Sequence, residues 1–157
     1  MECAENGEVR DIQSTKARAL KILGSRMFSA REIEKRLKAK GETEEDAKQA
    51  AEWLVSIGAI DDRQYAESIV RHYTSKGYGL ARIRDELFKR GIDREMWDEA
   101  LVCAEGMEEA AVAYLAKKLG GSSDEEDLRK AAAALCRRGF TYSKAHEAIN
   151  RYLEEKE

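Results

Sequence analysis

The run KGYGLARIRDELFKRGI, residues 76–92, decides the fold. Between Gly79 and Gly91, apolar side chains recur every three or four residues, which predicts a short helix. The expected apolar stripe contains Leu80, Ile83, Leu87 and Phe88. At about 100° per residue, Arg82 and Lys89 fall within roughly 20° of each other on the opposite face. The pattern predicts a helix with a buried side and a cationic side, ended by a glycine that tolerates the left-handed conformation.

The same pattern occurs three times in the chain. The pattern is an apolar residue, then a leucine four positions later, then a glycine four positions after the leucine. It recurs at offsets of 50 and 48 residues, in Ile33, Leu37 and Gly41, in Ile83, Leu87 and Gly91, and in Ala131, Leu135 and Gly139. A residue that can cap a new helix follows each glycine: Thr43, Asp93 and Thr141. Three copies at a nearly constant period predict an internal repeat.

The composition favours helices throughout. The 157 residues include no proline, 38% are charged, and strong helix formers dominate. We therefore expect an all-α protein of three tandem three-helix repeats. Each repeat is too small to bury a core alone, so stacked neighbours should form an elongated, curved body. The expected division is a mobile N-terminal tail and three repeats: residues 1–15, 16–58, 59–104 and 105–157.

Local signals refine the first repeat. Its first helix is expected to begin near Ser14 or Thr15. Ser29 and Glu32 have the spacing of a capping box, in which each side chain bonds the other residue's backbone N–H. The third helix is expected to run to about Ile57 and to bury that side chain against the core.

Charge is distributed unevenly along the chain, although the formal net charge is only −3. Residues 16–41 carry +7 and residues 63–94 carry +4, whereas residues 42–62 carry −6 and residues 95–157 carry −5. If the basic helices share one side of the molecule, they form a surface that can meet phosphates or an acidic protein. An ordinary solvated helix face explains the same charges and stays open as an alternative.

No catalytic constellation is present in the sequence. His72 and His146 are far apart in the sequence and have no obvious nucleophile or acid as a catalytic partner. The metalloprotease, phosphate-loop and nucleophile-elbow motifs are all missing. The three cysteines have no spacing typical of metal ligands. We therefore expect a protein that is not an enzyme, with no cofactor and no metal.

Features of the chain also predict its cellular compartment. No apolar run approaches the roughly 20 residues that cross a bilayer, and the acidic N-terminus does not resemble a signal peptide. Cys3, Cys103 and Cys136 are odd in number, which suits a reducing cytoplasm, and the last two are expected to pack as small apolar residues.

Several of these motifs resemble those of the RecX family. The similar residues are Ile60-Asp61-Asp62, Tyr65-Ala66, Lys76-Gly77-Tyr78-Gly79, Arg82-Ile83, Glu86-Leu87, Gly91-Ile92 and the first-repeat run at 29–37. Position 80 is leucine, where the family often has proline. The resemblance implies a bacterial regulator of the RecA recombinase. It implies a fold of tandem three-helix repeats that binds within the RecA–DNA filament, and in several members of the family the protein also binds DNA directly. It further implies that strand exchange, ATP hydrolysis and co-protease activity of RecA fall.

The basic helices supply the candidate contacts with a RecA filament or with single- and double-stranded DNA. The candidates are Lys21, Arg26, Arg31, Lys35, Arg71, Lys76, Arg82, Arg84, Lys89 and Arg90, with Tyr78 as a residue that could stack on a base. We expect a monomer without strong sequence preference and without a membrane partner. Two other hypotheses stay open: a sequence-specific helix-turn-helix repressor and a helical adaptor for another protein.

Overall fold

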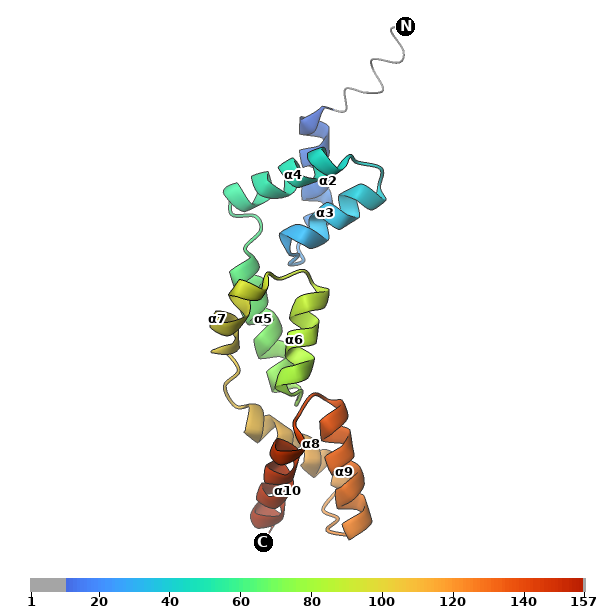
Figure 1. The fold of residues 1–157 in the computed structure, drawn as a ribbon, viewed down its shortest axis with the longest axis vertical. Helices are drawn as coiled ribbons and strands as arrows, with labels where there is room; N and C mark the ends of the chain where they lie inside the picture. The colour runs from blue at the N-terminus through green and yellow to red at the C-terminus, as the bar shows by residue number, and fades with distance from the viewer. Residues whose placement is uncertain (1–10, 157) are drawn as a thin grey trace, which may run out of the picture. The chain divides into compact units, whose positions relative to one another are not determined.

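The computed structural model describes residues 11–156, and these residues form nine α-helices and no strand (Figure 1). The helices are α2 (Ile12–Leu23), α3 (Ala30–Ala39), α4 (Glu44–Ser56), α5 (Asp62–Ser75), α6 (Leu80–Lys89), α7 (Trp97–Leu101), α8 (Met107–Leu119), α9 (Glu125–Arg137) and α10 (Tyr142–Lys156). A 3-10 turn at Arg94–Met96 leads into α7. The all-α prediction is confirmed, whereas the elongated, curved shape stays a prediction.

Two compact units divide the described residues. The first contains residues 11–65 together with 90–92, and the second contains residues 66–89 and 93–156. The turn after α6 therefore belongs to the first unit, while α6 itself belongs to the second.

The first helix begins earlier than expected. Asp11 caps α2, because its side chain accepts a hydrogen bond from the Gln13 backbone N–H at 3.1 Å. Residues 12–15, which we assigned to a mobile tail, are therefore helical. The rest of that expected tail, residues 1–10, lies outside the described residues. The capping box of Ser29 and Glu32 is present as predicted.

The repeated pattern has the same structural role in all three copies. The two apolar residues of each copy are fully buried on its middle helix. They are Ile33 and Leu37, Ile83 and Leu87, and Ala131 and Leu135. The glycine that follows each helix has a positive φ in Gly41, Gly91 and Gly139. A residue with a side chain would be strained in that conformation, so the glycine is required by the backbone.

In the first unit, α2, α3 and α4 pack around one hydrophobic core. A charged side chain is buried beside it: Glu42 accepts a hydrogen bond from the Thr15 hydroxyl at 3.0 Å and pairs with the Arg18 guanidinium. These partners explain how the carboxylate tolerates burial. Helix α4 ends before Ile57, which is 53% exposed, so the prediction that this side chain is buried was wrong.

In the second unit, α8, α9 and α10 surround a separate core that is rich in alanine. Gly79, just before α6, lies against Gly139, just after α9. The Gly79 N–H donates to the Arg138 carbonyl at 2.8 Å, and the Ala81 N–H donates to the Gly139 carbonyl at 3.2 Å. A side chain on Gly79 would fall 2.5 Å from the Gly139 carbonyl oxygen. We call Gly79, Arg82, Arg138 and Gly139 the Gly79 contact.

The first unit holds the corresponding arrangement. The Ser29 hydroxyl donates a hydrogen bond to the Arg90 carbonyl at 2.5 Å. A side chain on Gly91 would lie 2.8 Å from the Arg31 Cβ. We call Ser29, Arg31, Arg90 and Gly91 the Ser29 contact. Neither contact was predicted, because each joins residues about 60 positions apart in the chain.

Three further side chains differ from the sequence predictions. Leu80 and Phe88 were expected in the apolar stripe of α6, but they are 37% and 73% exposed, and Glu86 is buried instead. Cys136 was expected to pack as a small apolar residue, but it is exposed; Cys103 is half-buried. Cys3 lies outside the described residues.

Candidate nucleic-acid interface

The structure separates the predicted contact residues by exposure. Eight of the eleven are exposed: Lys21, Arg26, Arg31, Lys35, Arg71, Lys76, Arg84 and Lys89. Tyr78, Arg82 and Arg90 are half-buried. The first unit holds five of the eleven and the second unit holds six, with α6 and the turn before it supplying most of the second group. Whether the two groups form one surface stays a prediction.

Arg82 has a structural partner inside its own helix. Its Nε donates to the Glu86 carboxylate at 3.2 Å, and Glu86 is only 8% exposed. The guanidinium also lies 5.1 Å from the centre of the Tyr78 ring. Because a buried carboxylate needs a compensating charge, Arg82 stabilises the core side of α6 as well as contributing positive potential.

Some exposed cations are already paired with acids. Lys89, the other residue of the predicted cationic side, lies 3.1 Å from the Asp85 carboxylate one turn earlier. Arg71 lies 3.6 Å from the Glu67 carboxylate in the same way. Such exposed pairs contribute little stability, so a phosphate can replace the acid at small cost.

Four of the exposed candidate residues form neither an ion pair nor a ring contact with any residue in 11–156. We call them the unpaired cations: Lys21, Lys35, Lys76 and Arg84. Arg26 also has no ion pair there, but its guanidinium lies 4.4 Å from the centre of the Phe28 ring. The charge of the unpaired cations is not compensated locally, so they contribute most directly to attraction of an anionic partner.

Arg90 and Tyr65 interact in the first unit. Arg90 Nη1 donates to the Tyr65 hydroxyl at 3.1 Å. Burial raises the pKa of the Tyr65 phenol, and the hydrogen bond from Arg90 offsets part of that rise. Arg90 is therefore held in place by the fold, and it is a weaker candidate for contact with a partner than the unpaired cations.

Tyr78 interacts with an arginine that the sequence analysis missed. The Arg138 guanidinium lies 3.9 Å from the centre of the Tyr78 ring and 4.2 Å from the centre of the Tyr114 ring. Its Nε donates to the Gly77 carbonyl at 3.0 Å, and its Nη2 donates to the Lys76 carbonyl at 2.5 Å. One arginine of the third repeat thus orders the turn that carries two predicted contact residues.

Phe88 was also missed as a surface residue. It lies one helical turn after Arg84 on α6, so the two side chains are neighbours on the solvent-facing side of that helix. An exposed phenylalanine next to an unpaired arginine is typical of contact surfaces, because aromatic side chains supply binding energy and can stack on bases.

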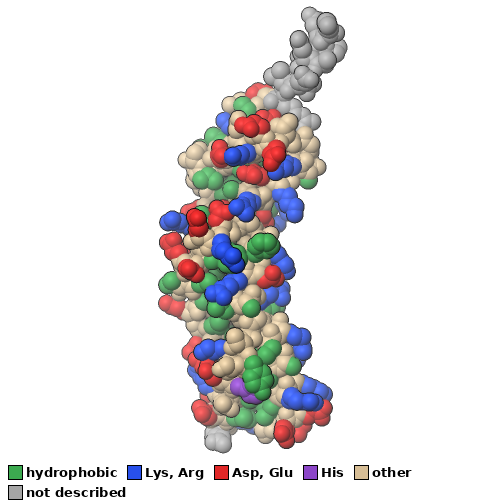
Figure 2. Space-filling view, in the orientation of Figure 1, with side chains coloured by type: hydrophobic (Ala, Val, Ile, Leu, Met, Phe, Trp, Pro, Cys, Tyr) green, Lys and Arg blue, Asp and Glu red, His purple; other side chains and the backbone are tan. Residues whose placement is uncertain are grey.

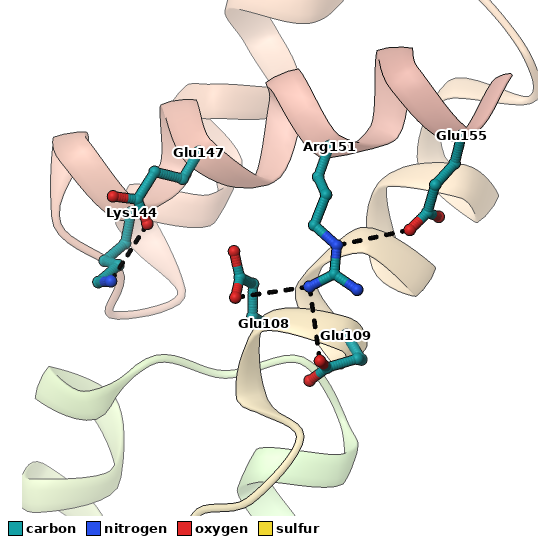
Figure 3. A network of polar contacts seen from close by, with 6 residues as sticks. All are labelled: Glu108, Glu109, Lys144, Glu147, Arg151 and Glu155. Atoms are coloured by element: carbon teal, nitrogen blue, oxygen red, sulfur yellow. Dashed lines mark hydrogen bonds and ion pairs between the residues drawn. The ribbon is translucent and has the colours of Figure 1, made fainter. Parts of the chain in front are cut away.

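The third repeat differs in how its cations are paired. Figure 3 shows Arg151 of α10 between carboxylates from two helices, with Glu108 at 3.4 Å, Glu109 at 3.5 Å and Glu155 at 3.5 Å. Although desolvation lowers the pKa of Arg151, these carboxylates raise it above its usual value. Lys144 likewise lies 3.1 Å from Glu147. Because Arg151 and Lys144 are compensated by these carboxylates, the two residues attract an anion less than the unpaired cations do.

The face in Figure 2 shows Lys and Arg side chains interleaved with Asp and Glu. Within each of the two units, the positive charge on that face is not gathered into one uninterrupted patch. Contact with an anionic polymer would therefore depend on particular unpaired cations.

No helix within residues 11–156 is long and apolar enough to cross a membrane. Within the same part of the chain, no group of three or more His, Cys, Asp or Glu side chains is placed to hold a metal ion.

The fold defines a class: an all-helical protein built of three-helix domains, with exposed cations on its helices. Comparison with known families matches residues 16–54 to the first three-helix domain of RecX and residues 61–101 to the second. The chain is 36% identical over 146 residues to regulatory protein RecX of Xanthomonas campestris pv. campestris (strain B100), covering 91% of this chain and 90% of that protein. The chain belongs to the RecX family.

Other relatives agree with this assignment. Regulatory protein RecX of Stenotrophomonas maltophilia (strain R551-3) is 36% identical over 131 residues, which is 82% of this chain and 80% of that protein. The crystal structure of RecX from Lactobacillus salivarius has the same fold, with a TM-score of 0.73 and 24% identity over 90% of this chain and 96% of that chain. A second crystal structure of regulatory protein RecX gives a TM-score of 0.71 at 25% identity. The match covers 89% of this chain and 71% of that chain. These relatives place the chain among regulatory proteins that are not enzymes.

Proposed function

We propose that this chain inhibits the RecA recombinase by binding the RecA–DNA filament through its basic helices. Bound in this way, it blocks filament growth and thereby lowers ATP hydrolysis, strand exchange and co-protease activity in DNA repair and the SOS response. The observation that carries the proposal is membership of the RecX family over nine-tenths of the chain. The proposal places the protein in the cytoplasm, as a monomer, with single- and double-stranded DNA bound without strong sequence preference.

The proposed organisation is three repeats at residues 16–58, 59–104 and 105–157. The two matched RecX domains fall inside the first two of these ranges. In this proposal the unpaired cations contact the filament directly, and Arg82, Arg90 and Tyr78 shape the surface around them. Phe88 joins the contact set because it is exposed beside Arg84.

The experiment is an ATPase assay on a purified RecA filament with the full chain added. The wild-type protein should lower the rate of hydrolysis. A Lys35→Glu, Arg84→Glu double variant should need about tenfold more protein for half inhibition, because two cations that attract an anionic partner are reversed. Arg82 is a poor choice for reversal, since its loss also disturbs buried Glu86.

The matched control is Lys48→Glu, an exposed lysine on the acidic helix α4 that should inhibit like the wild type. If the chain leaves the ATPase rate unchanged, the adaptor hypothesis replaces inhibition. If the chain binds one duplex sequence far more tightly than random duplex, the repressor hypothesis replaces it.

A further inference from the structure

A pocket in the second unit is lined by cations and tyrosines. It has a volume of about 360 Å³ and lies where the turn after α5, one face of α8 and the end of α9 meet. We call it the Arg138 pocket, and its functional side chains are Lys76, Tyr78, Tyr114, Lys117 and Arg138. The remaining lining side chains are serine and alanine, so the pocket carries three positive charges and no carboxylate.

These three charges are not compensated inside the protein. Lys76 and Lys117 are exposed and form no ion pair with a residue in the described range. The hydrogen-bond partners of Arg138 are neutral carbonyl groups, and its ring contacts are neutral tyrosines. Three like charges around one cavity repel each other, so an anion in the cavity relieves that repulsion.

Arg138 is also fixed before any ligand arrives. Two of its nitrogens donate to the turn at residues 76–77, and its guanidinium lies close to the centres of two tyrosine rings. An arginine that is already ordered loses less conformational entropy on binding. Its planar group still has N–H donors beyond those two hydrogen bonds, and such donors match the oxygens of a phosphate.

We propose that the Arg138 pocket binds a backbone phosphate of single-stranded nucleic acid, which extends the DNA-binding part of the proposed function and rests on it. The volume suits one phosphate with part of its nucleotide. Cations beside aromatic rings are the usual combination in single-strand sites, and a flexible single strand enters a recessed pocket more easily than a stiff duplex does. The site would bring the third repeat into the interface, although residues 95–157 are acidic overall.

Two neighbouring lysines on α8 provide a matched test. Lys117 lines the pocket. Lys118 is also exposed and also lacks an ion pair within residues 11–156, but it lies outside the pocket lining. Binding of a fluorescein-labelled thymidine oligonucleotide to the full chain is measured by anisotropy over a series of salt concentrations. Lys117→Gln should weaken binding several-fold and reduce the slope of log affinity against log salt by about 0.7, the value for one phosphate on a single strand. Lys118→Gln should change both quantities much less.

A second measurement identifies the source of the phosphate. In the wild-type chain, the amide NMR signals of Gly77 and Tyr78 should shift with the thymidine oligonucleotide at lower concentration than with thymidine monophosphate or inorganic phosphate. Tighter binding of the free nucleotide would overturn the assignment to a nucleic-acid strand. Equal weakening by Lys117→Gln and Lys118→Gln, with no shift at Gly77 and Tyr78, would overturn the pocket itself.

Failure of the pocket can be told apart from failure of the proposed function. If the wild-type chain inhibits the RecA ATPase and binds the oligonucleotide but both lysine variants behave alike, only the pocket is wrong. If the wild-type chain inhibits RecA without binding the oligonucleotide, the pocket and the DNA part of the function are both wrong. If it does neither, the regulatory proposal fails as well.

Discussion

The Ser29 contact and the Gly79 contact join equivalent positions of the repeat through different atoms. Ser29 and Gly79 each stand four residues before the first buried position of a middle helix, and Arg90 and Arg138 each precede the repeated glycine. In the first contact a serine hydroxyl donates to the arginine carbonyl. In the second the Gly79 backbone N–H donates to it. A side chain can adjust to a change and a backbone cannot, so the second contact should tolerate substitution less well.

The two contacts should differ most in the free energy of unfolding that is lost when alanine replaces the repeated glycine. Gly139→Ala places a Cβ 2.5 Å from the Arg82 backbone nitrogen at a φ of +101°, so we expect a loss of about 3–5 kcal/mol in the free energy of unfolding. Gly91→Ala meets the side chain of Arg31 at a φ of +74°, and we expect a loss of about 1–3 kcal/mol. Urea unfolding followed by circular dichroism measures both.

Gly58 provides the control for backbone strain alone. Its φ is +75°, and apart from its chain neighbours no atom of the described residues lies within 4 Å of the added Cβ, so Gly58→Ala should cost about 1–2 kcal/mol. The loss in the free energy of unfolding at Gly91 or Gly139, minus the loss at Gly58, then measures the steric crowding around the added Cβ. Equal losses at Gly91 and Gly139 would show that the backbone contact at Gly79 is no stiffer than the side-chain contact at Ser29.

Replacing the arginine before each glycine should also destabilise the Gly79 contact more than the Ser29 contact, but by a smaller margin. Arg138→Ala removes two hydrogen bonds to carbonyls and two ring contacts, and we expect a loss of about 2–3 kcal/mol. Arg90→Ala removes the bond to the Tyr65 hydroxyl and should cost about 1–2 kcal/mol. Thermal unfolding ranks the two variants.

Arg137→Ala is the control for this pair, because Arg137 is exposed and adjacent to Arg138. It should change the free energy of unfolding by less than about 0.5 kcal/mol. A loss at Arg138 no larger than at Arg137 would mean that the Tyr78 and Tyr114 contacts do not order the turn.

The repeat itself could be predicted because its signals are local. Ile83, Leu87 and Gly91 lie within nine residues, and helical periodicity and glycine geometry both act over that range. The capping box of Ser29 and Glu32 spans only four residues and was predicted for the same reason.

The remaining features depend on partners far away in the chain. Helix α6 buries positions 83, 86 and 87, which fits the predicted period, but position 86 holds a glutamate that is tolerated because Arg82 lies beside it. Hydrophobicity alone assigned that place to Phe88, which is exposed. Arg138 interacts with a carbonyl 61 residues upstream, and no spacing rule in the sequence connects such a pair.

A substitution at Ser29 should separate the two tasks of its hydroxyl. The oxygen accepts from the Glu32 N–H as a helix cap at 3.1 Å and donates to the Arg90 carbonyl. Ser29→Ala should therefore cost about 2 kcal/mol. Thr43 caps α4 through the Asp46 N–H at 3.1 Å, and its hydroxyl forms no further hydrogen bond within residues 11–156, so Thr43→Ala should cost about 1 kcal/mol. Urea unfolding that gives the same loss for both would remove the energetic basis of the Ser29 contact.

The smallest expected effect is a loss of stability at alkaline pH. It involves Tyr65, which accepts a hydrogen bond from Arg90 of the Ser29 contact. Burial raises the pKa of Tyr65 above 10.0 in the folded protein, so the unfolded chain loses this proton first as pH rises. The stabilisation is therefore fully present below a pH of about 10 and declines above it. Tyr65→Phe cannot ionise, and the other tyrosines and the lysines are common to both proteins. The stability difference between wild type and Tyr65→Phe, measured by urea unfolding, should stay constant up to a pH of about 10 and shrink as the pH rises further. A constant difference would show that the phenol beside Arg90 is not buried in solution.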